Sequence, residues 1–107
     1  MTTFDEREEG FEKKFAVDEE LKFKAEARRN KLLGLWAAEK LGISGDVATA
    51  YAKEVVAADF EAAADRGALH KVLKDLTAKG NAVTEGDIRA KMDELLIQAV
   101  AQVKAGV

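Results

Sequence analysis

The pattern of apolar and polar positions indicates a first helix over about residues 20–41. Apolar side chains recur there at the spacing that one face of a helix requires. The residues of this face are Ala25, Leu32, Leu33 and Trp36. Gly34 lies between two leucines, where the lack of a side chain would let a neighbouring helix approach closely. Gly42 follows, and glycine is the residue type that ends helices in the left-handed conformation.

A second helix is predicted over about 45–64, because Ser44 can cap its first turn and an approximate apolar stripe follows. The residues of the stripe are Val47, Ala48, Tyr51, Ala52, Val55 and Phe60. The segment Asp65–Gly67 interrupts it. A third helix over about 67–79 carries Leu69, Val72, Leu73 and Leu76 and stops at Gly80-Asn81.

The fourth predicted helix, about 85–104, has the strongest amphipathic pattern. It follows Thr84, which resembles the start of a capping box with Asp87 in place of the usual Glu. Its apolar positions are Ile88, Met92, Leu95, Leu96, Ala99, Val100 and Val103. Short connections favour antiparallel neighbours, so we expect an all-α fold: a small four-helix bundle over residues 20–107.

Residues 1–19 differ from this body and form a predicted N-terminal arm. The first 20 residues contain eight acids and three bases, whereas the rest contains twelve acids and fourteen bases. Phe4, Phe11 and Phe15 are spaced so that a helix would project them within about 40° of one another. Gly10 and the short length make an isolated helix marginal, so we expect an arm that is mobile when free and only partly helical. The bundle is too short to cover the whole stripe, which implies a partner.

Composition excludes several classes of function. The chain has 107 residues, no Cys, no Pro and one His, and its net charge is −3. Without Cys there are no disulfides, thiolate nucleophiles or thiolate metal sites, and a net negative charge argues against nucleic-acid binding. We expect His70 to be a solvated or partly buried structural residue. No catalytic residue, metal site or cofactor is predicted.

A basic cluster on the first helix leaves two interpretations open. Its members are Lys22, Lys24, Arg28, Arg29 and Lys31. One interpretation is a solvated flank that pairs with Glu26 and the acids of the arm. The other is a phosphate or adenine-nucleotide contact made by Lys24, Arg28, Arg29 and Lys31.

Several segments together resemble one known family. They are Thr2–Asp5 and Phe11–Ala16, then Phe23–Ala25 and Ala27–Gly42, then Ala50–Val56 with Ala58–Phe60, and finally Lys91–Leu96. These segments look like the zeta subunit family of alphaproteobacterial F-type ATP synthases, and the likeness spans nearly the whole chain. Gly10 and Ala64–Gly67 depart from the family pattern.

The resemblance implies a non-catalytic regulatory subunit that inhibits ATP hydrolysis. By this likeness the arm inserts as a helix into a catalytic interface between alpha and beta subunits near gamma, and blocks the rotor. The implied contact residues are Thr2, Thr3, Phe4, Asp5, Arg7, Glu8, Phe11, Glu12, Lys14 and Phe15. The implied partner is the catalytic sector of the ATP synthase, with a weak adenine-nucleotide contact as a second ligand.

The remaining expectations concern location and rival functions. The amino terminus carries acids where a secretory signal has an apolar run, and no window approaches 18 apolar residues. We therefore expect a cytoplasmic protein, monomeric when free, without membrane insertion, and peripheral at the inner membrane when bound to ATP synthase. The alternative functions are a helical adaptor and an adenine-nucleotide-binding bundle that uses the basic face of the first helix.

Overall fold

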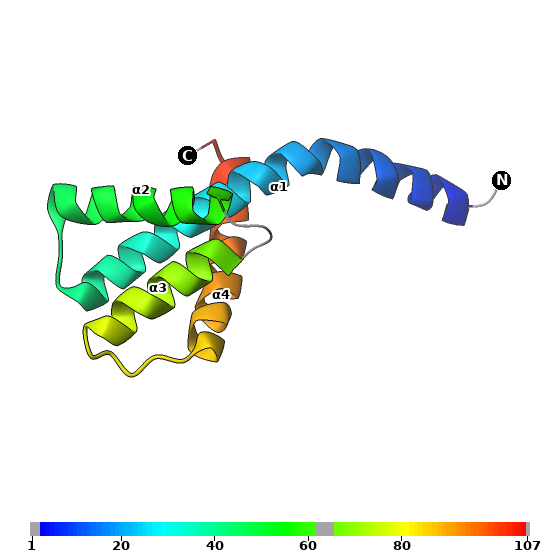
Figure 1. Cartoon of the computed structure of the whole chain (residues 1–107). Coiled ribbons are helices and arrows are strands. Elements are labelled where there is room, and N and C mark those ends of the chain that lie inside the picture. The colour runs from blue at the N-terminus through cyan, green and yellow to red at the C-terminus, as the bar shows by residue number, and fades with distance from the viewer. Residues whose placement is uncertain (1–2, 62–65, 107) are drawn as a thin grey trace.

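The computed structural model describes the backbone of residues 3–61 and 66–106 and the side chains of residues 19–60 and 67–106. This part of the chain is all-α and consists of four helices (Figure 1). They are α1 (Thr3–Leu41), α2 (Gly45–Glu61), α3 (Arg66–Ala78) and α4 (Glu85–Lys104). The predicted fold class is confirmed. The predicted end of the second helix at 64 lies outside the described residues.

The first helix is much longer than its bundle segment. It has 39 residues, whereas α2, α3 and α4 have 17, 13 and 20. At about 1.5 Å per residue it spans about 58 Å, which accounts for the longest dimension of the molecule, 59 Å. Figure 1 shows its N-terminal half extending beyond the other three helices. The helix therefore runs through the predicted boundary at 19/20 and through Gly10 without a break.

Both helix ends predicted from glycines have the expected cap. Gly42 and Gly80 adopt φ of +76° and +93°, in the left-handed region. After Gly42, the Ile43 N–H donates to the carbonyl of Ala38 at 3.0 Å. After Gly80, the Asn81 N–H donates to the carbonyl of Leu76 at 2.9 Å in the same way. This 6→1 bond is the Schellman motif, which satisfies carbonyls that the helix leaves unpaired.

The capping box at the start of α4 is also confirmed. The Asp87 N–H donates to Thr84 Oγ1 at 3.1 Å, and the Thr84 N–H donates to Asp87 Oδ2 at 3.0 Å. The shorter Asp side chain therefore replaces the usual Glu. Ser44 immediately precedes α2, and its carbonyl accepts the Ala48 N–H at 3.4 Å.

The bundle core lies where α1 packs against each of the other three helices. The largest fully buried side chains are Leu33, Val55, Leu69, Val72, Leu76 and Ile88. Each comes from a stripe predicted by periodicity. Two members of the predicted α2 stripe are corrections: Val47 is 61% exposed and Phe60 is 73% exposed. They remain exposed although α2 packs against both α1 and α3, because these two neighbours cover only part of its circumference.

Two glycines are required by close contact between helices. A Cβ on Gly34 of α1 would lie 2.6 Å from Ala52 Cα of α2, so the predicted close approach is present. A Cβ on Gly67 would collide with the backbone of α2 at Ala58 and Asp59. At these two points, α1 and α3 each approach α2 so closely that no side chain fits between the backbones.

Among the described helices, none is both long enough and apolar enough to cross a lipid bilayer.

Candidate functional site

The predicted contact residues of the arm share one uninterrupted helix. The backbone of α1 includes every member of that set except Thr2, which lies outside the described residues. The set on α1 is Thr3, Phe4, Asp5, Arg7, Glu8, Phe11, Glu12, Lys14 and Phe15. Their side chains also lie outside the described part of the chain, so the structure places these positions on a helix and defines no contact for them.

The basic cluster lines an open groove beside the point where α1 joins the bundle. The groove has a volume of about 510 Å³. Its described lining is Phe23, Lys24, Ala27, Arg28 and Lys31 of α1, Val56 of α2 and Val103 of α4. Three of the four predicted nucleotide contacts, Lys24, Arg28 and Lys31, therefore meet in one place. We call this site the basic groove.

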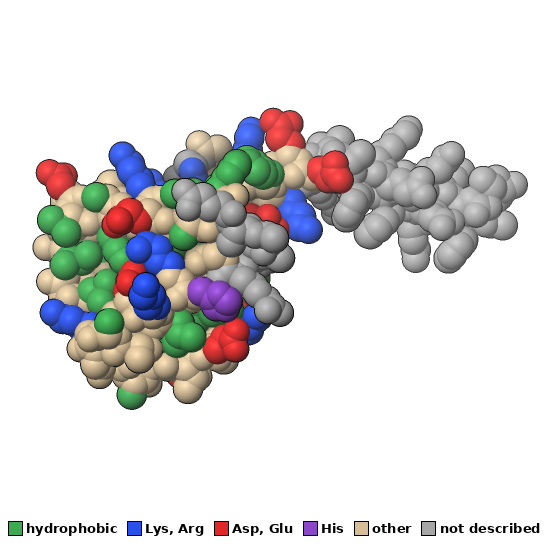
Figure 2. Space-filling view, viewed as in Figure 1, with side chains coloured by type: hydrophobic (Ala, Val, Ile, Leu, Met, Phe, Trp, Pro, Cys, Tyr) green, Lys and Arg blue, Asp and Glu red, His purple; other side chains and the backbone are tan. Residues whose placement is uncertain are grey.

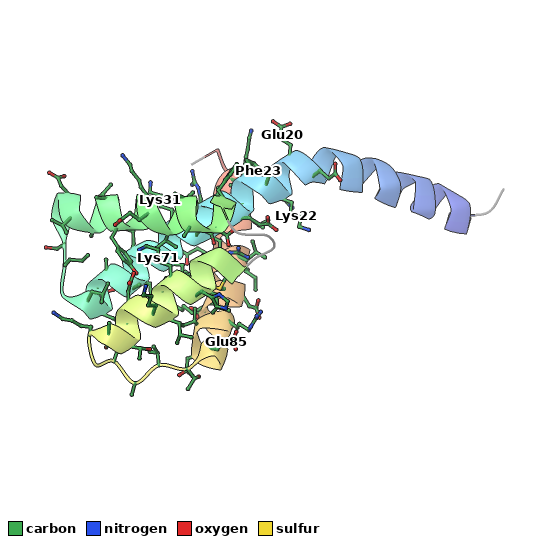
Figure 3. All side chains as sticks on the ribbon, in the orientation of Figure 1. Glu20, Lys22, Phe23, Lys31, Lys71 and Glu85 are labelled. Atoms are coloured by element: carbon green, nitrogen blue, oxygen red, sulfur yellow. The ribbon has the colours of Figure 1, made fainter. Side chains whose placement is uncertain are left out.

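The cations of the basic groove are held to different degrees. Arg28 Nη1 donates to Gln102 Oε1 of α4 at 3.3 Å, which fixes the guanidinium across two helices. Lys24 pairs with Glu20 at 3.5 Å, although both side chains are more than half exposed and such a pair contributes little stability. Lys31 is exposed on the same side of α1 (Figure 3). The groove thus offers one anchored and two movable cations.

One exposed aromatic ring, Phe23, lines the groove, and a second, Phe60, contacts it. Phe23 is 56% exposed and Phe60 is 73% exposed, and their rings meet edge to face with centroids 5.9 Å apart. Figure 2 shows hydrophobic side chains next to charged ones where α1 leaves the bundle. The sequence interpretation did not single out Phe23 as a surface residue. The available signal was its position, which falls outside the apolar face that contains Ala25.

Arg29 is not part of this surface, which corrects the expectation of a solvated flank. It is only 5% exposed, and its Nε and Nη2 donate to Asn30 Oδ1 at 3.2 and 3.1 Å. Asn30, 3% exposed, donates through Nδ2 to Asp59 Oδ2 at 2.8 Å. Asp59 Oδ1 in turn accepts the Ala68 N–H in the first turn of α3 at 3.2 Å. This polar network joins α1, α2 and α3 inside the bundle.

A second polar cluster joins α2 to α3. The Tyr51 hydroxyl donates to Asp75 Oδ2 at 2.8 Å, and Lys71 Nζ lies 3.2 Å from the same oxygen. Burial raises the pKa of Tyr51 well above its ordinary value, and the hydrogen bond to Asp75 raises it further. A tyrosine of this kind stays protonated, so it serves as a structural donor.

The single histidine and the acidic side chains of the described residues do not gather into a metal site. His70 is exposed, as one of the predicted alternatives stated. Within residues 19–60 and 67–106, no group of three His, Asp or Glu side chains is placed to hold a metal ion. The features that remain for a function are the extended helix and the basic groove.

Comparison with known proteins identifies the family. The family model described as ATPase inhibitor subunit zeta matches residues 1–102. The chain belongs to the ATPase inhibitor subunit zeta family. The resemblance inferred from the sequence is thereby confirmed, and the matched range of this zeta-family chain includes both the arm and the bundle.

A solved structure supports the fold of this zeta-family chain. A protein determined by solution NMR is 53% identical to it, with a TM-score of 0.70, and the likeness covers 81% of this chain and 99% of that one. A comparison with functionally curated proteins gave no match. A zeta-family chain is thus a member of a family of inhibitor subunits, whose role is regulatory.

Proposed function

We propose that the protein inhibits ATP hydrolysis by an F-type ATP synthase, and that the N-terminal half of α1 inserts as a helix into a catalytic interface between alpha and beta subunits near gamma. The family supports the inhibitory activity. The observation that carries the insertion is the 39-residue α1, which extends beyond a bundle whose longest other helix has 20 residues. A helix without neighbours has room for a partner on every side.

The arm has the composition of an inserted helix. Phe4, Phe11 and Phe15 share one face by spacing, and aromatic anchors supply most of the affinity in helix-in-groove complexes. The arm is also net negative whereas the rest of the chain is not, and such charges set register and partner choice. The bundle stays outside the interface because it is too wide to follow, and it limits how far the arm can travel with the rotor.

The decisive experiment compares full-length protein with a variant that lacks residues 2–19. The cognate ATP synthase is assayed for ATP hydrolysis at increasing inhibitor concentration, and circular dichroism reports whether the bundle is folded. Deletion should abolish inhibition and leave the thermal transition of the bundle in place. Inhibition retained by residues 20–107 would refute the assignment of the arm.

Point variants refine the same test. Phe11→Ala and Phe15→Ala should each weaken inhibition by about 1–3 kcal/mol with little change in melting temperature. Phe60→Ala is the matched control, since it removes an exposed ring of the bundle. If the melting temperature collapses in the arm variants, those rings belong to the core of the free protein.

The basic groove favours a second candidate function, weak binding of an adenine nucleotide. Lys24, Arg28 and Lys31 surround an opening that Phe23 borders, so phosphates and a base would each meet suitable groups. Titration of the full chain with ATP, followed by NMR, should show saturable shifts at these residues. The variants Lys24→Glu and Lys31→Glu should abolish them, whereas Lys74→Glu on α3 should not. Shifts that do not saturate would eliminate this function.

A further inference from the structure

A second, smaller pocket lies between α1 and the last turns of α4. Its volume is about 190 Å³. The described residues that line it are Leu21, Lys22, Ala25, Leu96, Val100 and Lys104. We call it the junction pocket, because it is located where α1 leaves the bundle. None of its residues takes part in the proposed insertion of the arm or in the basic groove.

The junction pocket continues the face on which the anchors of the arm lie. At 100° per residue, positions 11, 15, 22 and 25 of α1 fall within about 80° of one another. Ala25 is fully buried, so this is the face that α1 turns toward the bundle. A partner that covers positions 11 and 15 therefore reaches the junction pocket next along the same helix. Figure 3 shows that Lys22 leaves α1 on the side opposite Glu20.

The pocket combines an apolar floor with two cations. Leu21, Leu96 and Val100 are half-buried, whereas Lys22 and Lys104 are exposed. Within the described part of the chain, neither ammonium group forms an ion pair. Lys104 suits the carbonyl end of α4, but Lys22 has no such explanation because it lies in the middle of α1.

Some other cations of the bundle are paired within their own helix. Lys71, Arg89 and Lys91 each pair with a carboxylate three or four positions away on their own helix. Two unpaired cations beside exposed apolar surface are complementary to an acidic segment that carries an apolar side chain. The arm of α1 is acidic, so it would face a basic region of the partner. The lysines of the junction pocket, next along the same helix, would face an acidic region of that partner.

We propose that the junction pocket is a second docking site on the protein that receives the arm, and that it seats an apolar side chain flanked by Asp or Glu at the rim of the catalytic cleft. This inference rests on the proposed function. A rim contact fixes how deeply the arm enters, because α1 is one helix and cannot slide independently of the bundle. It also holds the arm at high effective concentration beside the cleft, which slows dissociation.

Charge reversal in the full-length chain tests the site. Lys22→Glu with Lys104→Glu should raise the concentration needed for half-maximal inhibition by about tenfold or more. Lys53→Glu with Lys74→Glu is the matched control, with the same change of charge at exposed lysines of α2 and α3 that line neither the basic groove nor the junction pocket. Salt should weaken the wild-type complex more than the pocket variant, since the variant has lost the attraction that salt screens.

A cross-linking experiment locates the contact directly. The chain contains no cysteine, so Lys104→Cys labelled with a photoreactive group reports a single position. The adduct with the ATP synthase should map to a peptide rich in Asp and Glu, whereas the same label at Lys74→Cys on α3 should give no adduct there. An adduct with a second copy of the chain, or with its own arm, would overturn the proposal.

The two levels of inference fail in different ways. If Phe11→Ala weakens inhibition and the pocket variant does not, the junction pocket is no docking site and the proposed function stands. If the chain that lacks residues 2–19 still inhibits fully, the proposed insertion of the arm fails and the docking site fails with it. If the double variant inhibits less but also has an altered thermal transition, the result does not support the site. The single variant Lys104→Glu, at the end of α4, then decides: reduced inhibition by this variant in a folded protein supports the site, and unchanged inhibition counts against it.

Discussion

At the scale of single residues, Tyr51 shows how a buried polar group obtains a hydrogen-bond partner. Its ring is 8% exposed, and its hydroxyl donates to Asp75, which also accepts from Lys71. The carboxylate is therefore neutralised by one cation while it accepts a neutral donor. Lys71 also lies 5.2 Å from the centre of the Tyr51 ring, so the two side chains support each other.

The raised pKa of Tyr51 predicts a loss of stability at alkaline pH. An unfolded chain releases the tyrosine proton near pH 10, whereas the folded protein keeps it because burial and Asp75 oppose a phenolate. The folded state then binds more protons than the unfolded state, so the free energy of unfolding falls as the pH rises above about 10. Below that pH the contribution of Tyr51 is complete.

The measurement is direct, because Tyr51 is the only tyrosine. The tyrosinate absorbance of the native protein should appear only above pH 10 and together with unfolding. Tyr51→Phe should cost about 1 kcal/mol at neutral pH and remove this part of the alkaline loss. Asp75→Asn keeps an acceptor without its charge and should move the titration closer to pH 10. A folded protein that titrates near pH 10 would contradict the expected environment.

At the scale of elements, the contact between α1 and α2 depends on Gly34. A side chain there would meet Ala52 Cα at 2.6 Å and Ala52 Cβ at 3.0 Å, both on a rigid helix. A glycine inside a helix costs about 1 kcal/mol relative to alanine. At Gly34 this cost is offset by the close packing of α1 on α2 that the missing side chain permits. The close contact brings Val55 and Leu33 into the same core.

Gly34→Ala should therefore have two opposing effects on the free energy of unfolding, one from helix propensity and one from packing. The alanine gains about 1 kcal/mol of intrinsic preference, but forcing a methyl group into a packed contact costs about 1–3 kcal/mol. We expect a net loss of about 1 kcal/mol in chemical denaturation. Gly86→Ala in α4 is the matched control, since the nearest atom to its Cβ would be Thr84 Oγ1 at 3.7 Å. That variant should be neutral or slightly stabilised, and equal gains for both would disprove the packing role of Gly34.

The elements also show what sequence can and cannot predict. The caps at Gly42 and Thr84 and the helix end at Gly80 were predicted because each is formed by residues within a few positions of one another. The burial of Arg29 and Asn30 was missed, because their partner Asp59 lies on another helix and no local pattern announces it. Phe60 was assigned to the core for the related reason that periodicity marks a face without showing whether a neighbour covers it.

The same division holds for the candidate site. Spacing alone brought Phe4, Phe11 and Phe15 onto one face and marked the basic cluster. It did not reveal that Arg29 turns inward while Arg28 is held by Gln102 across two helices. It also did not reveal the junction pocket, which combines residues of α1 and α4 that are about 80 positions apart in the chain. Such sites follow from the packing of helices and become visible only with it.

At the scale of the whole molecule, one helix serves two purposes. Its C-terminal half is the centre of the bundle and touches all three other helices. Its N-terminal half extends away from them (Figure 1). The packed half is stabilised by its neighbours, whereas a helix segment that extends away from them depends mainly on its own helix propensity.

Hydrogen exchange of the free protein tests this division. A helix segment without tertiary contacts opens with little free energy, whereas amides in a packed core exchange only through larger unfolding events. We expect backbone amides of residues 3–18 to exchange almost without protection and those near Leu33 and Val55 to be strongly protected. Addition of the ATP synthase should protect the arm, because its folding would then be coupled to binding.

Gly10 supplies the matched variant for that measurement. Replacing it by alanine adds about 1 kcal/mol of helix preference in the middle of the arm and touches nothing in the bundle. If the arm folds as it binds, Gly10→Ala lowers the cost of ordering, so protection of the free arm should rise and inhibition should become up to about fivefold tighter. If residues 3–18 of the wild-type protein are already as protected as the core, the arm is a preformed helix, and Gly10→Ala should leave inhibition unchanged.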